Sequence, residues 1–276
     1  MLRTLYALLI ASCLLAGTAR AGDPYVIIHV KGTILRASTR TPIQVGDRLD
    51  GEERLIFKGS DAVAAAMAPG KGRFVIKPQA GSSSSELGLV LRESLSPGTG
   101  QLSTRSGSGH QVILRNSFGV QEHFEVPAYL VLGTAEVEID SEEYPLNSQY
   151  YFYVTYQYGE AAHTHKVKLP AEGKLVRFSQ EILFGQIDSL NLSEVKDPKL
   201  YYMRYNRAES ICSFHPVFVD EEVVTQEVKA IVQGMKEVNA SEGEIRNMVL
   251  NHLNELYGRP NVDNVNAWLD KQVFAE

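Results

Sequence analysis

Two histidines separated by one residue, His163 and His165, are the most direct candidates for chemistry in this sequence. In an extended strand this spacing directs both imidazoles to one face. Paired imidazoles bind zinc or copper when a third ligand converges on them. Because no cysteine or acidic residue follows at a matching spacing, we predict that the chain has no metal or other cofactor. His163 and His165 would be the ligands if a metal were bound.

A thiol and an imidazole lie three positions apart at Cys212 and His215. A reactive cysteine usually sits at a helix N-terminus or beside a cationic group. Residues 211–219 instead read as a strand, in which residues three apart point to opposite faces. We therefore predict that Cys212 is a buried structural thiol. Because no segment of the sequence forms a catalytic signature, we also predict that the chain has no catalytic residue and is not an enzyme.

An aromatic run at residues 150–158, with sequence YYFYVTYQY, is the most distinctive local pattern of the chain. Strand alternation assigns Tyr150, Phe152 and the other even-numbered positions to one face, which would be the core. Tyr151 and Tyr153 then lie on the opposite face. There they form either a binding surface for a protein or a glycan, or part of a strand that is buried on both sides.

The first residues of the chain are typical of an export signal. Arg3 is followed by an apolar run over residues 5–16 and by small residues at Ala19 and Ala21, so we expect residues 1–21 to be a signal peptide. Cleavage there would release a periplasmic or extracellular chain. In the alternative interpretation, residues 10–13 (IASC) are a lipobox, and Cys13 carries a lipid anchor.

Composition limits the possible partners. The net charge of −6 argues against nucleic acid, whose phosphates require a basic face. After the leader, no apolar run approaches the roughly 20 residues needed to span a bilayer, so we expect no transmembrane segment in the mature chain. Cleavage would also remove one of the two cysteines, which leaves Cys212 without an intrachain disulfide partner.

Residues 22–80 contain short apolar strands separated by turn residues, which predicts a small β-roll or barrel. The segments KGTI at residues 31–34, IQVGDRL at 43–49, LIF at 55–57 and GKGRF at 70–74 resemble the FecR-type periplasmic domain. The resemblance rests on turn glycines and core aliphatic residues. It implies a binding or sensing module outside the cytoplasm.

Three further regions follow. Residues 81–110 contain nine serines and six glycines, which predicts a linker or mobile loop, although residues 87–91 could still pair as a strand. Residues 111–219 hold about eight short strands, which favours an immunoglobulin-like β-sandwich. Residues 220–276 have helical periodicity and a capping box at Ser241 and Glu244, which predicts a helical cap. The fold class is thus mainly β with a C-terminal α segment.

These patterns favour a non-catalytic binding or assembly protein of the cell envelope or of a secreted complex, with a protein partner. One alternative is a secreted hydrolase whose residues, among them His110, His123 and His215, meet only in the folded chain. The other is a carbohydrate-binding protein that uses Tyr151 and Tyr153. A flat, exposed aromatic platform would favour the carbohydrate-binding alternative.

Overall fold

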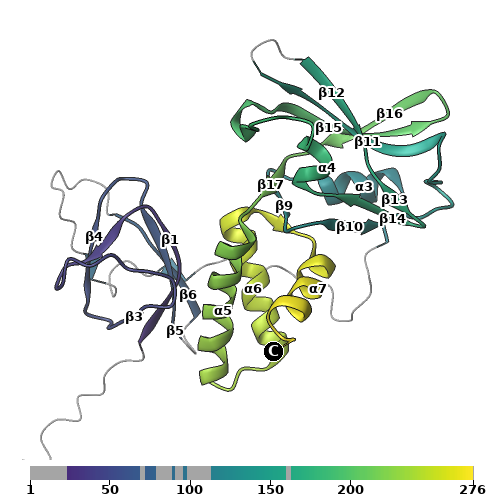
Figure 1. Cartoon of the computed structure of the whole chain (residues 1–276). Helices are drawn as coiled ribbons and strands as arrows, with labels where there is room; N and C mark the ends of the chain where they lie inside the picture. The colour runs from purple at the N-terminus through teal and green to yellow at the C-terminus, as the bar shows by residue number, and fades with distance from the viewer. Residues whose placement is uncertain are drawn as a thin grey trace, which may run out of the picture. The chain divides into compact units, whose positions relative to one another are not determined.

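The computed structural model describes residues 24–68, 72–78, 89–90, 96–97, 113–159 and 163–275. The chain is mainly β with a C-terminal helical segment, as the sequence predicts (Figure 1). Residue contacts divide it into two units. The first comprises residues 1–99 and 229–240, and the second comprises residues 100–228 and 241–276.

The first unit contains two antiparallel sheets. One has the strand order β3-β1-β5-β6-β8 and the other β2-β4-β7. The strands of the larger sheet are β1 (Tyr25–Lys31), β3 (Arg48–Leu49), β5 (Val63–Ala68), β6 (Gly72–Ile76) and β8 (Ser96–Pro97). Those of the smaller sheet are β2 (Ile34–Arg36), β4 (Arg54–Phe57) and β7 (Leu89–Val90).

The core of the first unit is built from the inward-facing aliphatic residues of these strands. Ile27, Ile34, Leu49 and Leu55 are at most 1% exposed. Gly32 follows β1 at a φ of 77°, and a Cβ there would lie 3.0 Å from that of Ala62, so this turn requires glycine. No sheet of the described residues closes into a barrel, which corrects the barrel form of the prediction. Among the described residues, the edge strands β3 and β8 have two residues each, too few to form a closing ladder.

Most of the predicted linker at residues 81–110 lies outside the described residues, as do the leader and Cys13. Within that segment the structure describes β7 and β8. The pairing of β7 with β4 places a strand in the apolar middle of the segment, where the sequence left that possibility open.

The second unit is organised around a four-stranded antiparallel sheet in the order β12-β11-β15-β16 (Figure 1). Its strands are β11 (Tyr150–Tyr158), β12 (His163–Lys168), β15 (Lys196–Arg204) and β16 (Arg207–Ser213). A three-stranded antiparallel sheet contains β10 (Ala135–Glu138), β13 (Ala171–Glu172) and β14 (Leu175–Phe178). A parallel sheet contains β9 (Tyr129–Val131), β17 (Pro216–Phe218) and β18 (Arg259–Pro260).

This arrangement differs from the expected immunoglobulin-like sandwich in two respects. Helices α3 (Ser117–Phe124) and α4 (Gln180–Phe184) interrupt the strand succession, and both contribute buried residues to the core. The side chains of Asn116 and Ser179 cap the two helices by accepting a backbone N–H bond. In addition, β9 is buried along its whole length and pairs with β18, which lies beyond residue 219.

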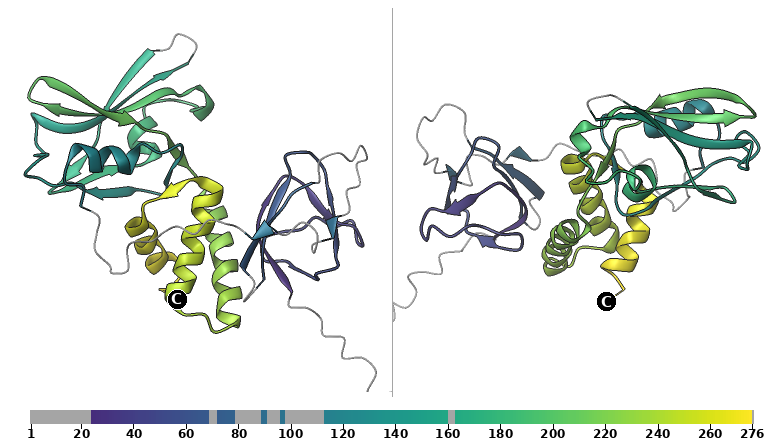
Figure 2. Two further views of the ribbon diagram at one scale, coloured as in Figure 1. Left: turned by 180° about the vertical axis from the view of Figure 1, so that it is seen from behind. Right: turned by 45° about the horizontal axis from the view of Figure 1, so that its top comes forward.

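Three long helices occupy the C-terminal region: α5 (Glu221–Glu237), α6 (Glu242–Tyr257) and α7 (Val262–Gln272). The capping box at Ser241 and Glu244 is confirmed. Helices α6 and α7, both in the second unit, lie side by side (Figure 2). Arg246 on α6 donates to the backbone carbonyl of Asn266 on α7 at 3.4 Å. Among the described helices, none has both the length and the apolar character that a membrane span requires.

A buried polar cluster fixes α6 to the first turns of α5 inside the second unit. Glu227 and His252 are 1% and 0% exposed. The Glu227 carboxylate lies 2.8 Å from His252 Nε2 and accepts the Tyr257 hydroxyl at 2.9 Å. Burial and the neighbouring carboxylate raise the pKa of Tyr257. These contacts make the cluster a structural element of the helix interface.

Candidate binding face

The two faces of β11 separate as strand alternation predicts. Phe152, Val154 and Tyr156 are buried in the core of the second unit. Tyr151 and Tyr153 lie on the opposite face of the sheet, together with Thr155. The face that bears Tyr151 and Tyr153 is therefore the one turned away from that core.

Pairing with β15 extends these two tyrosines into a row. Tyr153 lies opposite Tyr201, and their rings stack with centroids 5.2 Å apart and an interplanar angle of 12°. The rings of Tyr151 and Tyr153 are 6.0 Å apart. We call Tyr151, Tyr153 and Tyr201 the tyrosine row.

Two lysines from β12 cover the tyrosine row. Lys166 Nζ lies 4.0 Å from the centroid of the Tyr153 ring, and Lys168 Nζ lies 4.4 Å from that of Tyr151. Both lysines are exposed. An ammonium group over an aromatic face is held by the quadrupole of the ring, so these two charges are pre-positioned. The outermost groups at these two rings are therefore cations.

Burial distinguishes the two tyrosines that the sequence singled out. Tyr151 is half-buried, whereas Tyr153 is only 5% exposed, because Tyr201 and Lys166 cover its ring. Burial, followed by the neighbouring Tyr201 and Tyr151, raises the pKa of Tyr153. Tyr153 therefore lies beneath Lys166 as the buried member of the tyrosine row. A ligand on this face would contact Tyr151 and the two lysines first.

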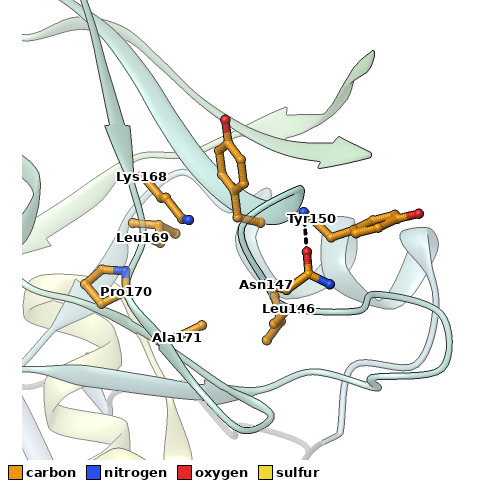
Figure 3. Close-up of a pocket in the computed structure, with 8 residues that line it drawn as sticks. Leu146, Asn147, Tyr150, Lys168, Leu169, Pro170 and Ala171 are labelled. Carbon is orange, nitrogen blue, oxygen red and sulfur yellow. Dashed lines mark hydrogen bonds between the residues drawn. The ribbon is translucent and has the colours of Figure 1, made fainter. Parts of the chain in front are cut away.

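A cavity of about 400 Å³ adjoins the row at Tyr151 and Lys168. Its other lining residues are Leu146, Asn147, Tyr150, Leu169, Pro170 and Ala171. Figure 3 shows Leu169 and Pro170 on one side of this space and Asn147 on the other. Asn147 Oδ1 accepts the backbone N–H groups of Gln149 and Tyr150 at 2.8 and 3.1 Å, which fixes the loop before β11.

The charge on this face is positive although the chain as a whole is negative. Lys199 lies opposite Thr155 and therefore shares the face with Lys166 and Lys168. Lys199 bonds Asp197 at 2.8 Å, so its charge is balanced locally. Lys166 and Lys168 supply the net positive charge beside the tyrosine row.

The two candidate metal ligands, His163 and His165, lie on β12 as predicted. The His165 ring stacks on Tyr156, with centroids 5.1 Å apart and an interplanar angle of 7°. Within the described part of the chain, no cluster of three or more histidine, cysteine, aspartate or glutamate side chains has the geometry to hold a metal ion.

Cys212 is buried in the core of the second unit, as the sequence predicts. Burial, with a smaller contribution from Glu125, raises its pKa to about 12. The thiol therefore stays protonated at neutral pH, which is the opposite of what a nucleophilic cysteine needs.

A second candidate site surrounds His123 at the end of α3. His123 Nε2 lies 2.8 Å from the Tyr129 hydroxyl. The side chain of Asn261 also bonds Tyr129, and Asn261 Oδ1 accepts the backbone N–H of Asn264.

This histidine remains neutral at ordinary pH. Burial and the nearby Arg259 lower the pKa of His123 to about 4, and burial raises that of Tyr129. A cleft of about 430 Å³ is lined by His123, Arg115, Arg259 and the exposed ring of Phe118, among others. The partner of this imidazole is a tyrosine hydroxyl, whereas a hydrolytic triad would pair it with a nucleophile and a carboxylate.

Sequence reasoning found Tyr151 and Tyr153 but missed Tyr201, Lys166 and Lys168. Alternation in residues 163–168 could have assigned the two lysines to one face of their strand. Only the pairing register shows that this face is the one that bears the tyrosines. His110 lies outside the described residues, and the His215 carbonyl accepts the backbone N–H of Tyr129.

The chain matches no known family model, no curated protein and no solved structure. The FecR-type resemblance of residues 22–80 therefore stays a prediction.

Proposed function

We propose that the chain is an exported, non-catalytic binding or assembly protein of the cell envelope or of a secreted complex. It contacts a protein partner through Tyr151, Lys166 and Lys168, with Tyr153 and Tyr201 supporting them. Export rests on the pattern of residues 1–21. The contact face rests on one observation: two exposed ammonium groups are held over a tyrosine row on the sheet face opposite the core.

The energetic basis of this proposal is pre-organisation. Long lysine side chains normally lose rotamer entropy when they bind a partner. Here the two ammonium groups already rest on aromatic rings, and the Tyr153 ring is fixed by stacking on Tyr201, so less entropy remains to be lost. The half-buried Tyr151 adds rigid contact area with a polar tip.

The carbohydrate-binding alternative would use open ring faces to stack on sugars. The rings of Tyr151 and Tyr153 instead carry lysine ammonium groups, and Tyr153 is buried. This geometry favours a partner with acceptor or anionic groups over a neutral sugar. The hydrolase alternative would centre on His123, whose neutral ring and tyrosine partner suit a structural role better.

Affinity capture with the full chain tests the proposal. The variant Tyr151→Ser with Lys168→Gln changes two accessible groups of the face. The matched control, Phe118→Ser with Lys174→Gln, changes an aromatic residue and a lysine outside this face and its cavity, since Phe118 is 71% exposed and Lys174 is exposed. We expect envelope and secreted fractions to yield a protein that the wild type and the control capture and that the face variant loses.

Two results would contradict the proposal. If the face variant and the control captured the partner equally well, this face would not be the contact surface. If the wild type captured no protein from either fraction, the chain would not have the proposed binding role. Circular dichroism should be unchanged in both variants, and the free energy of unfolding in urea should fall by at most about 1 kcal/mol, because the substituted side chains are half-buried or exposed.

A further inference from the structure

Strand β12 is the outermost strand of the four-stranded sheet. The strand order places it at the end of the sheet, paired with β11 alone among the described strands (Figure 1). Most residues of β12 are exposed, and only His165 and Val167 are partly buried. Its outer edge can therefore accept another strand.

The register shows which residues of β12 face that edge. The backbone N–H of Leu169 donates to the Phe152 carbonyl at 2.9 Å. Hydrogen-bonded positions alternate in antiparallel pairs, so His165 and Val167 also bond toward β11. Thr164, Lys166 and Lys168 consequently direct their own N–H and C=O groups outward.

The outward-bonding positions are the same ones that carry the lysines. An added strand that paired with Lys166 and Lys168 would place every second side chain beside an ammonium group already fixed over a tyrosine ring. Carboxylates at alternate positions of the added strand would match this spacing, because the side-chain period of both strands is two.

The same lysines discriminate among possible strands. Lysine at an edge discourages pairing with neutral or basic strands. A second copy of β12 would bring its own lysines and histidines against Lys166 and Lys168, with no acidic residue in His163–Lys168 to balance them. The two lysines therefore attract an acidic strand and repel a second copy of β12.

From this geometry we propose that the edge of β12 takes up an extended acidic segment of a partner protein as an additional strand. This inference rests on the proposed function and specifies its partner. Main-chain hydrogen bonds at Thr164, Lys166 and Lys168 supply affinity, and carboxylates opposite the two lysines supply specificity. The cavity beside Tyr151 and Lys168 lies at the end of this track and offers Leu169 and Pro170 to an apolar residue of the segment.

Isothermal titration of the full chain with a capped peptide of alternating glutamate and valine tests the proposal. The variant Thr164→Pro removes one outward N–H but keeps both lysines, and proline is tolerated where an edge N–H faces solvent. Thr164→Ala, which keeps the N–H, is the matched control. The pair Lys166→Gln and Lys168→Gln removes the charges alone.

We expect the wild type and Thr164→Ala to bind the acidic peptide, and more weakly as salt is added. Thr164→Pro should weaken binding about tenfold through the lost hydrogen bond and the ring at the edge. The double lysine variant should weaken it about tenfold or more. A peptide with lysine in place of glutamate should not bind.

Several results would overturn the inference. The wild type could fail to bind the acidic peptide, or Thr164→Pro could bind it as tightly as the wild type does. A sulfated polysaccharide that binds equally well to Thr164→Pro would place the anion on the face and not at the edge. A dimer in light scattering that Thr164→Pro abolishes would show that a second copy occupies the edge. If partner capture still depended on Tyr151 and Lys168 in these cases, the proposed function would stand without this inference.

Discussion

On the inner face of the four-stranded sheet, Tyr156 and Tyr202 bury both ring and hydroxyl, whereas on the outer face Tyr151 and Tyr153 serve as a base for charged groups. Tyr156 and Tyr202 are 2% and 0% exposed, and their hydroxyls donate to the carbonyls of Leu183 and Pro145. On the outer face, Tyr151 and Tyr153 instead carry lysine ammonium groups.

The difference comes from what each face has to satisfy. A buried hydroxyl without a partner is costly, so inner tyrosines occur where a backbone carbonyl is within reach. The outer Tyr151 has a lysine ammonium group over its ring and stays partly exposed, so its hydroxyl has no such requirement. Tyrosine therefore stabilises the core on the inner face, whereas on the outer face it forms part of the candidate binding surface.

We expect the largest difference between the two faces when a tyrosine side chain on each is truncated to alanine. Tyr202→Ala should lower the free energy of unfolding by about 3–5 kcal/mol, because it empties a fully buried site. Tyr201→Ala, its neighbour on the outer face, should cost about 1 kcal/mol, mainly through the lost ring stacking. Urea unfolding measures both values. Equal losses would show that the outer face is also a packed core.

Removing a single hydroxyl is a milder test. Tyr156→Phe keeps the ring but leaves the buried Leu183 carbonyl without its donor, so it should cost about 1–2 kcal/mol. Tyr151→Phe changes a half-buried residue on the outer face and should alter stability by less than about 0.5 kcal/mol. If Tyr156→Phe were neutral in urea unfolding, the inner hydroxyls would not be structural.

Cys212, which is buried on the inner face, should make the free energy of unfolding fall as the pH becomes alkaline. The native pKa of Cys212, about 12, lies above its ordinary value of 9.0, so its contribution is complete below pH 9 and is lost as pH rises toward 12. We expect the difference in unfolding free energy between wild type and Cys212→Ala to shrink over that interval by about 1 kcal/mol. Partial screening of the site by water keeps this change below the one that the full pKa shift would give. A constant difference would contradict a desolvated thiol.

Local sequence signals predicted local structure well. Alternation in residues 150–158 assigned each residue of β11 to its face, and the capping box located the start of α6. Strand pairing was less accessible, because no residue of 196–204 indicates that Tyr201 will lie opposite Tyr153. The same holds for β18, two residues whose pairing with β9 joins segments far apart in sequence. Helix α3 was missed although Asn116 is a good N-cap, since one cap before eight residues is a weak signal.

The smallest expected effect concerns the contact that defines the outer face. A double-mutant cycle between Lys166→Gln and Tyr153→Leu isolates the interaction of the ammonium group with the ring, because Leu keeps an apolar side chain at the buried position. The coupling in urea unfolding should be about 0.5–1 kcal/mol, the range for exposed cation–π pairs. The cycle between Lys174→Gln and Tyr153→Leu is the control, and its coupling should be close to zero. If the Lys166 cycle gave no coupling either, the ammonium group would not be held over the ring, and the pre-organisation that distinguishes the outer face from the inner one would be lost.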